Sequence, residues 1–229
     1  MATVREIVSD VHLQLYQGQV SDDAETERDQ IKFWLSYHLN QVVATECNEH
    51  TKRGQLVPAI YQVPDDLEVL DLEEMDGISE EDERIYVEMA ADVLDLNKDA
   101  GVIAILTDQN DEVKKATITT ILQFKHQKFG KPSLDNLLYY REGRKIFIYG
   151  FKAVDIPFST IRIWYVPKQN LLEMGEDDEV LCSALALPQV IASAVETGKM
   201  QLLGSQADHE SDGAEKINPV YHQQIRRPE

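Results

Sequence analysis

The chain has 229 residues, 43% of them hydrophobic, and carries 41 acidic against 22 basic side chains for a net charge of −19. This length predicts one domain or two small ones, and the acidic balance argues against a reader of nucleic-acid sequence while leaving passive contact with DNA open. No stretch approaches the ~20 consecutive apolar residues of a membrane span and the N-terminus has no apolar signal core, so we expect a soluble protein made in a cytoplasm.

Two amphipathic helices begin the predicted structure. Thr3-Val-Arg-Glu6 has the capping-box pattern of a helix start, and the apolar spacing after it predicts a helix over 3–16 that ends near Gly18. Asp22-Asp-Ala-Glu25 repeats the start signal, and a second apolar stripe predicts a longer helix over 22–49. The short polar connection between them predicts a helical hairpin.

The segment 55–100 predicts short strands around an acidic run. Ala59-Ile-Tyr-Gln-Val63 has the composition of a strand, and Pro64-Asp-Asp-Leu67 has that of a turn. The acidic residues of 71–83 are typical of a loop or a solvated face. Residues 85–96 regain an apolar share, and we favour a strand there over a helix.

Two runs rich in β-branched or aliphatic residues follow in the middle of the chain. Gly101–Leu106 predicts a buried strand, and Thr117–Phe124 predicts a second one. Because Asp108-Gln-Asn-Asp111 separates them, we expect a hairpin with its turn at these four residues.

The clearest strand signals come next. Leu137–Arg141 and Lys145–Tyr149 surround Glu142-Gly143, which is a strong local signal for a hairpin. Thr160–Val166 alternates between apolar and other residues and is closed by Pro167, so it predicts one more strand.

The last part of the chain predicts a loop, a helix and a tail. Asn170–Glu179 is an acidic loop, and Leu187-Pro188 begins a helix, with proline in the first turn where it is tolerated. We expect this helix to end at Gly198. Residues 204–229 contain too few apolar side chains to form a core, and we expect an extended tail held by a neighbouring subunit; the alternative is that the tail packs on its own domain.

Together these elements predict an α+β fold: an N-terminal helix pair, an inserted mainly antiparallel β region, a C-terminal helix and an extended tail. We expect four parts. They are a helical hairpin over 1–54, a β-rich insertion over 55–170, a linker and helix over 171–203 that pack on the N-terminal helices, and the tail over 204–229.

Charge is distributed unevenly along the chain. Residues 61–100 carry fifteen acidic against two basic side chains, whereas residues 112–170 carry eleven basic against four acidic ones and ten of the seventeen aromatic residues. A protein with an acidic and a basic part can stack on copies of itself. The alternative is a solvated acidic face beside an ordinary β region.

The sequence contains no common catalytic or cofactor motif, whether a phosphate loop, a dinucleotide-binding fingerprint or a nucleophile elbow. Cys47-Asn-Glu-His50 offers two ligands for zinc, but Cys182 and His126 are the only loose candidates for the other two. We therefore predict no catalytic residue, no cofactor and no metal, and we expect both cysteines to be reduced and buried.

Four further residues are interpreted as structural. His12 and His38 lie on or near apolar helix stripes, so we expect packed, hydrogen-bonded side chains rather than catalysts. Trp34 and Trp164 lie in periodic segments and are expected in the core. The basic aromatic region looks like a nucleic-acid platform, but most of its aromatic residues alternate within strands as core residues do.

The order of elements resembles a known family. Tyr139-Tyr-Arg-Glu-Gly-Arg-Lys-Ile-Phe-Ile-Tyr149 and Ile161-Arg-Ile-Trp-Tyr-Val-Pro167 are followed by an acidic loop and by Leu187-Pro-Gln-Val-Ile191. After an N-terminal helix pair, this order is similar to that of head–tail adaptor or neck ring proteins of tailed bacteriophages, in particular the crAss-like podoviruses. The resemblance covers roughly 4–43 and 137–203 and transfers no functional residue.

The resemblance implies a structural virion protein and no enzyme. It implies a homo-oligomeric ring, typically of twelve copies, that binds the portal and other neck or tail proteins and surrounds passing double-stranded DNA without reading its sequence. Assembly would take place in the host cytoplasm.

Two alternatives come from the residues themselves. The acidic run could bind a basic partner or imitate nucleic acid, in which case neutralising Glu80, Glu81, Asp82 and Glu83 would abolish that binding. The chain could also be a hydrolase whose site is not legible from the sequence.

Overall fold

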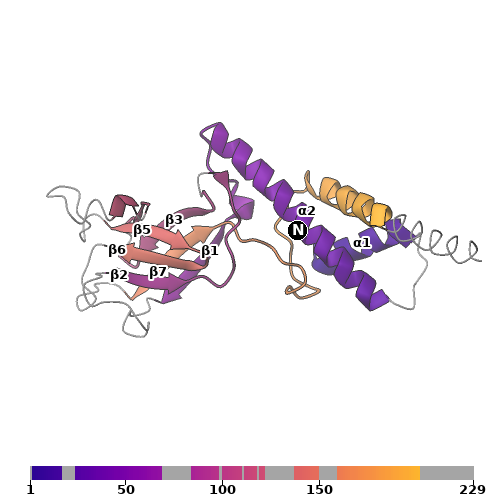
Figure 1. Cartoon of the computed structure of the whole chain (residues 1–229), viewed down its shortest axis with the longest axis horizontal. Coiled ribbons are helices and arrows are strands. Elements are labelled where there is room, and N and C mark those ends of the chain that lie inside the picture. The colour runs from indigo at the N-terminus through magenta and orange to yellow at the C-terminus, as the bar shows by residue number, and fades with distance from the viewer. Residues whose placement is uncertain are drawn as a thin grey trace, which may run out of the picture. The chain divides into compact units, whose positions relative to one another are not determined.

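The computed structural model describes residues 2–16, 24–68, 84–97, 100–109, 111–117, 119–121, 137–149 and 159–201. The chain divides into two compact units (Figure 1), the helical unit of Met1–Val42 with Gln169–Glu229 and the β unit of Val43–Lys168. Helices and antiparallel sheets together give the α+β fold that the sequence predicts. The predicted tail over 204–229 and the acidic run 71–83 lie outside the described residues.

Among the described residues, three helices build the helical unit. Helix α1 spans Val4–Tyr16, helix α2 spans Ala24–Lys52 and passes into the β unit from Val43 onward, and a C-terminal helix covers 187–201. These ranges confirm the predicted helices, although α2 ends three residues later than expected. Figure 1 shows the C-terminal helix in orange beside α1 and α2.

Gly198 does not end the C-terminal helix, contrary to the prediction, because the helix continues to residue 201. A Cβ atom at this position would lie 2.7 Å from Cζ3 of Trp34 and 2.9 Å from Cδ2 of Leu15. The glycine therefore allows the three helices to approach closely instead of stopping one of them.

The β unit contains a short 3₁₀ helix and two sheets. The 3₁₀ helix, η1, spans Ala59–Tyr61, and the strands are β1 (Val63–Glu68), β2 (Arg84–Glu88), β3 (Val102–Thr107), β4 (Lys114–Lys115), β5 (Leu138–Glu142), β6 (Lys145–Tyr149) and β7 (Thr160–Tyr165). The first sheet has the order β1-β7-β3, and the second has the order β2-β6-β5-β4. All pairings are antiparallel except that of β4 with β5.

Four predicted strands appear where expected, and two of them form the predicted hairpin. Strands β5 and β6 pair antiparallel on either side of Gly143, whose φ of 60° is the left-handed conformation that glycine adopts without strain. Strand β3 covers most of the predicted Gly101–Leu106 run, and β7 covers most of Thr160–Val166. The N–H of Thr107 donates to the carbonyl of Asp111 across the expected turn, but the predicted hairpin with 117–124 is wrong, because β3 pairs with β7 and residues 119–121 are helical.

The residues around Pro64 fold differently from the prediction. The predicted strand over 59–63 is mostly the helix η1, and the predicted turn over 64–67 is the strand β1. Pairing with β7 outweighs the local turn composition, because the alternate residues of β1 then place Leu67 against the core. Pro64 is tolerated because β1 lies at the edge of its sheet among the described residues.

Two other predicted strands are wrong in part. Residues 119–121 form a helical turn in which Thr117 accepts from the N–H of Thr120 at 3.1 Å, although residues 118 and 122–124 lie outside the described part. The strand expected over 85–96 ends at Glu88, and the remainder is irregular because its backbone bonds to other segments, as Leu94 does to Val166. Both predictions failed because hydrogen bonds decide these conformations, a local one at Thr117 and a long-range one at Leu94. The residue composition that suggested strands does not reveal such bonds.

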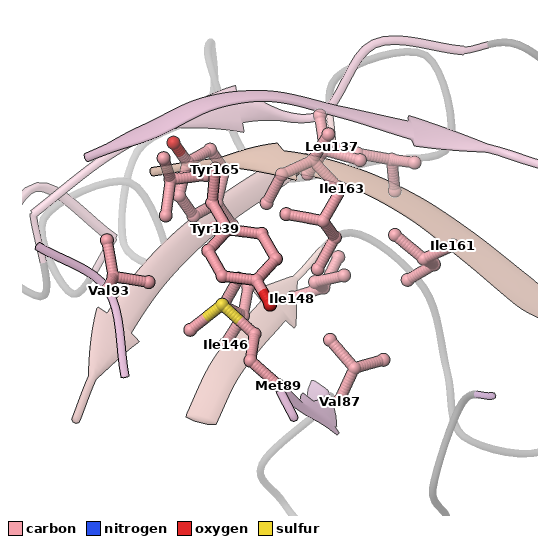
Figure 2. Packing of buried hydrophobic residues seen from close by; sticks show 13 residues of the cluster. Val87, Met89, Val93, Leu137, Tyr139, Ile146, Ile148, Ile161, Ile163 and Tyr165 are labelled. Carbon is pink, nitrogen blue, oxygen red and sulfur yellow. The ribbon is translucent and has the colours of Figure 1, made fainter. Parts of the chain in front are cut away.

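Facing sides of the two sheets form the main core of the β unit. Figure 2 shows Ile161, Ile163 and Tyr165 of β7 with Ile146 and Ile148 of β6 in one packed cluster. Its members are Val87, Met89, Val93, Val102, Ile105, Val113, Leu137, Tyr139, Ile146, Ile148, Ile161, Ile163 and Tyr165. A second cluster on the four-stranded sheet contains Tyr86, Ile121, Leu138, Phe147 and Tyr149. The expectation that alternating aromatic residues belong to the core is confirmed for these positions.

Candidate functional site

The acidic loop of the helical unit is fastened to helix α2 by buried amide groups. The side-chain amide of Asn40 donates to the carbonyl of Gln169 at 2.8 Å and accepts from its N–H at 2.9 Å. The Gln169 side chain in turn bonds both backbone groups of Leu181, each at 2.8 Å. One turn earlier in α2, the hydroxyl oxygen of Ser36 accepts a hydrogen bond from the N–H of Leu171 at 2.9 Å. The loop is therefore held at both ends.

The same loop caps the start of helix α1. The N–H groups of Val4 and Arg5, which have no partner inside the helix, donate to the carbonyls of Asp178 and Glu176 at 3.0 and 2.9 Å. Thr3 and Glu6 exchange the two hydrogen bonds of a capping box, as predicted. The N–H groups at the start of α1 are thus hydrogen-bonded by nearby side chains and by the 176–178 segment, which lies far away in the sequence.

Ion pairs hold Glu176 of this loop against helix α2. The Glu176 carboxylate pairs with Lys32 at 3.0 Å and with Arg28 at 2.9 Å, both on α2. The hydrogen bond from Lys32, aided by the positive charges of Arg28 and Arg5, lowers the pKa of Glu176 below its ordinary value. Part of the acidic loop is therefore neutralised by α2 rather than exposed as a negative face.

His38 connects α2 to the C-terminal helix. Its Nε2 lies 2.8 Å from the hydroxyl of Thr197, and burial lowers the pKa of the ring, against the opposing effect of Glu196. His12 packs against the ring of Tyr16 with centroids 4.9 Å apart. His38 is therefore the packed, hydrogen-bonded side chain that the sequence predicts, and Trp34 is buried as expected.

Large apolar side chains remain exposed mainly on the helical unit. Seven are exposed among the described residues, and only Leu56 belongs to the β unit; the others are Leu13, Phe33, Tyr37, Leu172, Leu185 and Met200. Phe33 and Tyr37 lie one turn apart on α2 and are 58% and 62% exposed. Isolated exposed hydrophobic residues are ordinary, but six of these seven belong to the helical unit, which makes this unit the candidate for a contact with another protein.

The outer side of the three-stranded sheet carries a charged and aromatic row. Arg162 of β7 forms two hydrogen bonds to the carboxylate of Asp66 on β1, at 2.6 and 2.9 Å, and lies over the ring of Trp164. Trp164 is half-buried on this outer side, so its expected place in the core is wrong. Strand alternation places it opposite Ile163 and Tyr165, which fill the core.

The residues considered for catalysis or metal binding do not come together. Cys47 and Cys182 are both buried and form no disulfide bond, and burial raises the pKa of Cys47 to about 11. Cys47 lies in the β unit and Cys182 in the helical unit, while His126 and the acidic residues of 80–83 lie outside the described residues. Within the described ranges, no group of three or more His, Cys, Asp or Glu side chains could hold a metal ion.

Sequence reasoning missed the surface of α2 because exposure depends on what covers each side of a helix. Ser36 and Asn40 have the polar character of solvent-facing residues, yet the 169–181 segment covers them. Phe33 and Tyr37 look like core residues by type, yet they stay exposed. Their spacing of four, on the side opposite Ile31 and Leu39, was a usable signal.

The described part of the molecule thus presents a packed α+β scaffold whose most distinctive chemistry is an exposed apolar surface, which is typical of an assembly subunit. The family model of phage tail ring protein 2, a family of crAss-like phages, matches residues 6–212. The chain belongs to this family, and it is a structural component of the virion that forms part of an oligomeric ring in the phage tail. No curated protein matches the chain. Among the described residues, no helix has both the length and the apolar character needed to cross a bilayer.

Proposed function

We propose that this protein is a neck ring, the head–tail connector that joins the portal to the tail and forms part of the channel through which DNA passes. The observation that carries the proposal is the family match over residues 6–212. In this role about twelve copies form the ring, a number that comes from the resemblance to neck rings, and the ring contacts the portal and other neck or tail proteins. Assembly takes place in the host cytoplasm.

The proposed mechanism is mechanical rather than catalytic. The net charge of −19 supports it, because a negative wall repels the phosphate backbone and keeps passing DNA from adhering. The fastened loop supports it as well, since Asn40 and Gln169 join distant parts of the chain into one load-resistant unit. No residue in this proposal reads a base or transfers a chemical group.

In the same proposal, neighbouring subunits are held together in two ways. The C-terminal tail of one copy binds the next copy, and a strand of one copy adds to the edge of a sheet in the next. The segment 204–229 is long enough to reach a neighbouring copy, and strand β1 lies at a sheet edge among the described strands. Main-chain hydrogen bonds to an edge strand give affinity without a specific pocket.

Electron cryo-microscopy of the particle, with symmetry analysis of the position of this chain, tests the function. We expect twelve-fold density beneath a capsid vertex, between the portal and the tail. Density at the distal end of the tail, or a different symmetry, would contradict the neck assignment. Sedimentation and limited proteolysis of the purified chain add a second check. A compact monomer with a protease-resistant tail would contradict the idea that neighbours hold the tail.

A further inference from the structure

Helix α2 contains thirteen successive residues without a formal charge, from Phe33 to Thr45. This is unusual in a chain of which 28% is charged. Within this stretch, Phe33, Tyr37 and Gln41 are exposed and recur every four residues, so they lie along one side of the helix. We call this side, with Phe33, Tyr37 and Gln41, the neutral stripe.

The neutral stripe faces away from the core of its own unit. Ile31, Leu35 and Leu39 on the opposite side of α2 are at most 1% exposed. The two flanks of the stripe are both occupied: Ser36 bonds the acidic loop at Leu171, and His38 bonds the C-terminal helix at Thr197. Phe33 and Tyr37 therefore remain exposed between two covered sides of α2.

Two further exposed apolar residues directly neighbour, in the sequence, residues that bond helix α2. Leu172 directly follows Leu171, whose N–H bonds Ser36, and Met200 directly precedes Gln201, whose side chain bonds Gln30 of α2 at 3.3 Å. Both Leu172 and Met200 are exposed. An aromatic surface without charged residues, such as Phe33 and Tyr37 form, has the composition of the buried middle of a protein interface.

We propose that the neutral stripe is the surface on which the neighbouring copy of this chain packs in the ring. This inference rests on the ring of the proposed function and assigns it a contact surface. Each copy carries a net charge of −19, so two copies repel one another wherever acidic residues meet. At an uncharged aromatic face, two copies of this chain can make contact with the least electrostatic repulsion. A basic partner would find no electrostatic attraction at such a face.

Ring closure adds a geometric consequence. Subunits related by rotation use two different surfaces, one on each side of every copy. The neutral stripe supplies one of these surfaces, and the next copy contributes another part of its own surface. Phe33 and Tyr37 are thus the anchors of a head-to-tail contact and do not meet themselves across a two-fold axis.

Photo-crosslinking tests the assignment on the full-length chain. The photoreactive residue benzoylphenylalanine replaces Tyr37, and the variant is mixed with unmodified protein labelled with ¹⁵N at the highest soluble concentration. We expect adducts that join one labelled and one unlabelled peptide. The matched control replaces Leu56, which is 82% exposed on the β unit, and should give far fewer mixed adducts. Absence of mixed adducts from position 37, or equal yields from both positions, overturns the assignment.

A charge-changing variant provides an independent readout. Phe33→Lys with Tyr37→Lys lowers the net charge to −17 and so weakens general repulsion between copies, yet it places two ammonium groups in the proposed contact. We expect at least ~10-fold fewer mixed adducts from a probe at Leu172, because aromatic anchors carry much of an interface's affinity. An unchanged or increased yield overturns the assignment, and circular dichroism confirms that the variant is folded.

These outcomes are separable from those of the proposed function. Mixed adducts at position 37 together with density outside the neck would retain the contact surface and reject the neck assignment. Twelve-fold neck density in which the neutral stripe faces solvent would retain the function and reject the contact surface.

Discussion

Asn40 of helix α2 holds both backbone groups of Gln169, a residue 129 positions further along the chain. Because Gln169 is buried, its N–H and carbonyl have no water to replace Asn40. We expect Asn40→Ala to lower the free energy of unfolding by about 1–3 kcal/mol. The reason is that a buried backbone group without a partner has given up its hydrogen bonds to water and gained none in return. Urea denaturation followed by circular dichroism measures the change.

The control for this prediction is Gln14→Ala, which removes an exposed amide from helix α1. Its effect should stay within about 0.5 kcal/mol, as is usual for surface substitutions. If both variants lose the same stability, the Asn40–Gln169 bonds do not hold the loop in solution.

Gly198 permits a close approach between helices, so adding one methyl group should destabilise the helical unit. Alanine is the better helix former by about 1 kcal/mol, but its Cβ would lie within 3 Å of Trp34 and Leu15. We expect Gly198→Ala to lose about 1–3 kcal/mol, as overpacking does. A double-mutant cycle with Trp34→Phe should show favourable coupling, because the smaller ring vacates the contact. A stabilised Gly198→Ala would mean that Trp34 and Leu15 move aside at little cost and that the close approach does not require glycine.

The elements that the sequence predicted correctly are those whose determinants lie within a few residues. Thr3 and Glu6 exchange their bonds across one helical turn, and Gly143 turns a hairpin with its own left-handed conformation. The amphipathic spacing of both N-terminal helices is likewise local. Such signals do not depend on the rest of the fold, which is why they transfer directly to the structure.

Most of the incorrect predictions depend on distant partners, although the helical turn at 119–121 is closed locally by Thr117. The turn-like Pro64–Leu67 becomes a strand because β7, about a hundred residues later, pairs with it. Gly198 has the composition of a stop signal, but its role is set by Trp34 and Leu15 from two other helices. The spacing of Phe33 and Tyr37 on α2 is a local signal for an exposed side, but their exposure also depends on which other sides the loop and the C-terminal helix cover.

The ion pairs of Glu176 make the stability of the helical unit dependent on pH. The folded pKa of this carboxyl is lowered, first by the Lys32 hydrogen bond, so its stabilising effect is fully present above the unfolded pKa and is lost as pH falls through the folded pKa. We expect Glu176→Gln to cost about 0.5–1 kcal/mol at neutral pH, as a half-exposed ion pair does. The difference from the parent protein should vanish in acid, which urea titrations across a pH series measure.

A more exposed pair at the same loop is the matched control. Asp177 contacts Arg5 at 3.2 Å with most of its side chain in solvent. Asp177→Asn should therefore give no measurable loss at any pH. A constant deficit of Glu176→Gln at all pH values would show that its effect is one of shape and not of charge.

The thiol of Cys47 should resist modification while the protein is folded. Burial, with Glu46 beside it, raises its pKa to about 11, so the thiolate is only about one part in a thousand at pH 8. We expect alkylation by iodoacetamide, followed by peptide mass mapping, to be slower at Cys47 than at an exposed reference thiol by at least ~100-fold. The reference is Gln14→Cys on the exposed side of α1, and unfolding in urea should bring the two rates together. Equal rates in the folded protein would mean that the end of helix α2 opens readily and that its contacts with Asn97 and Tyr61 do not persist in solution.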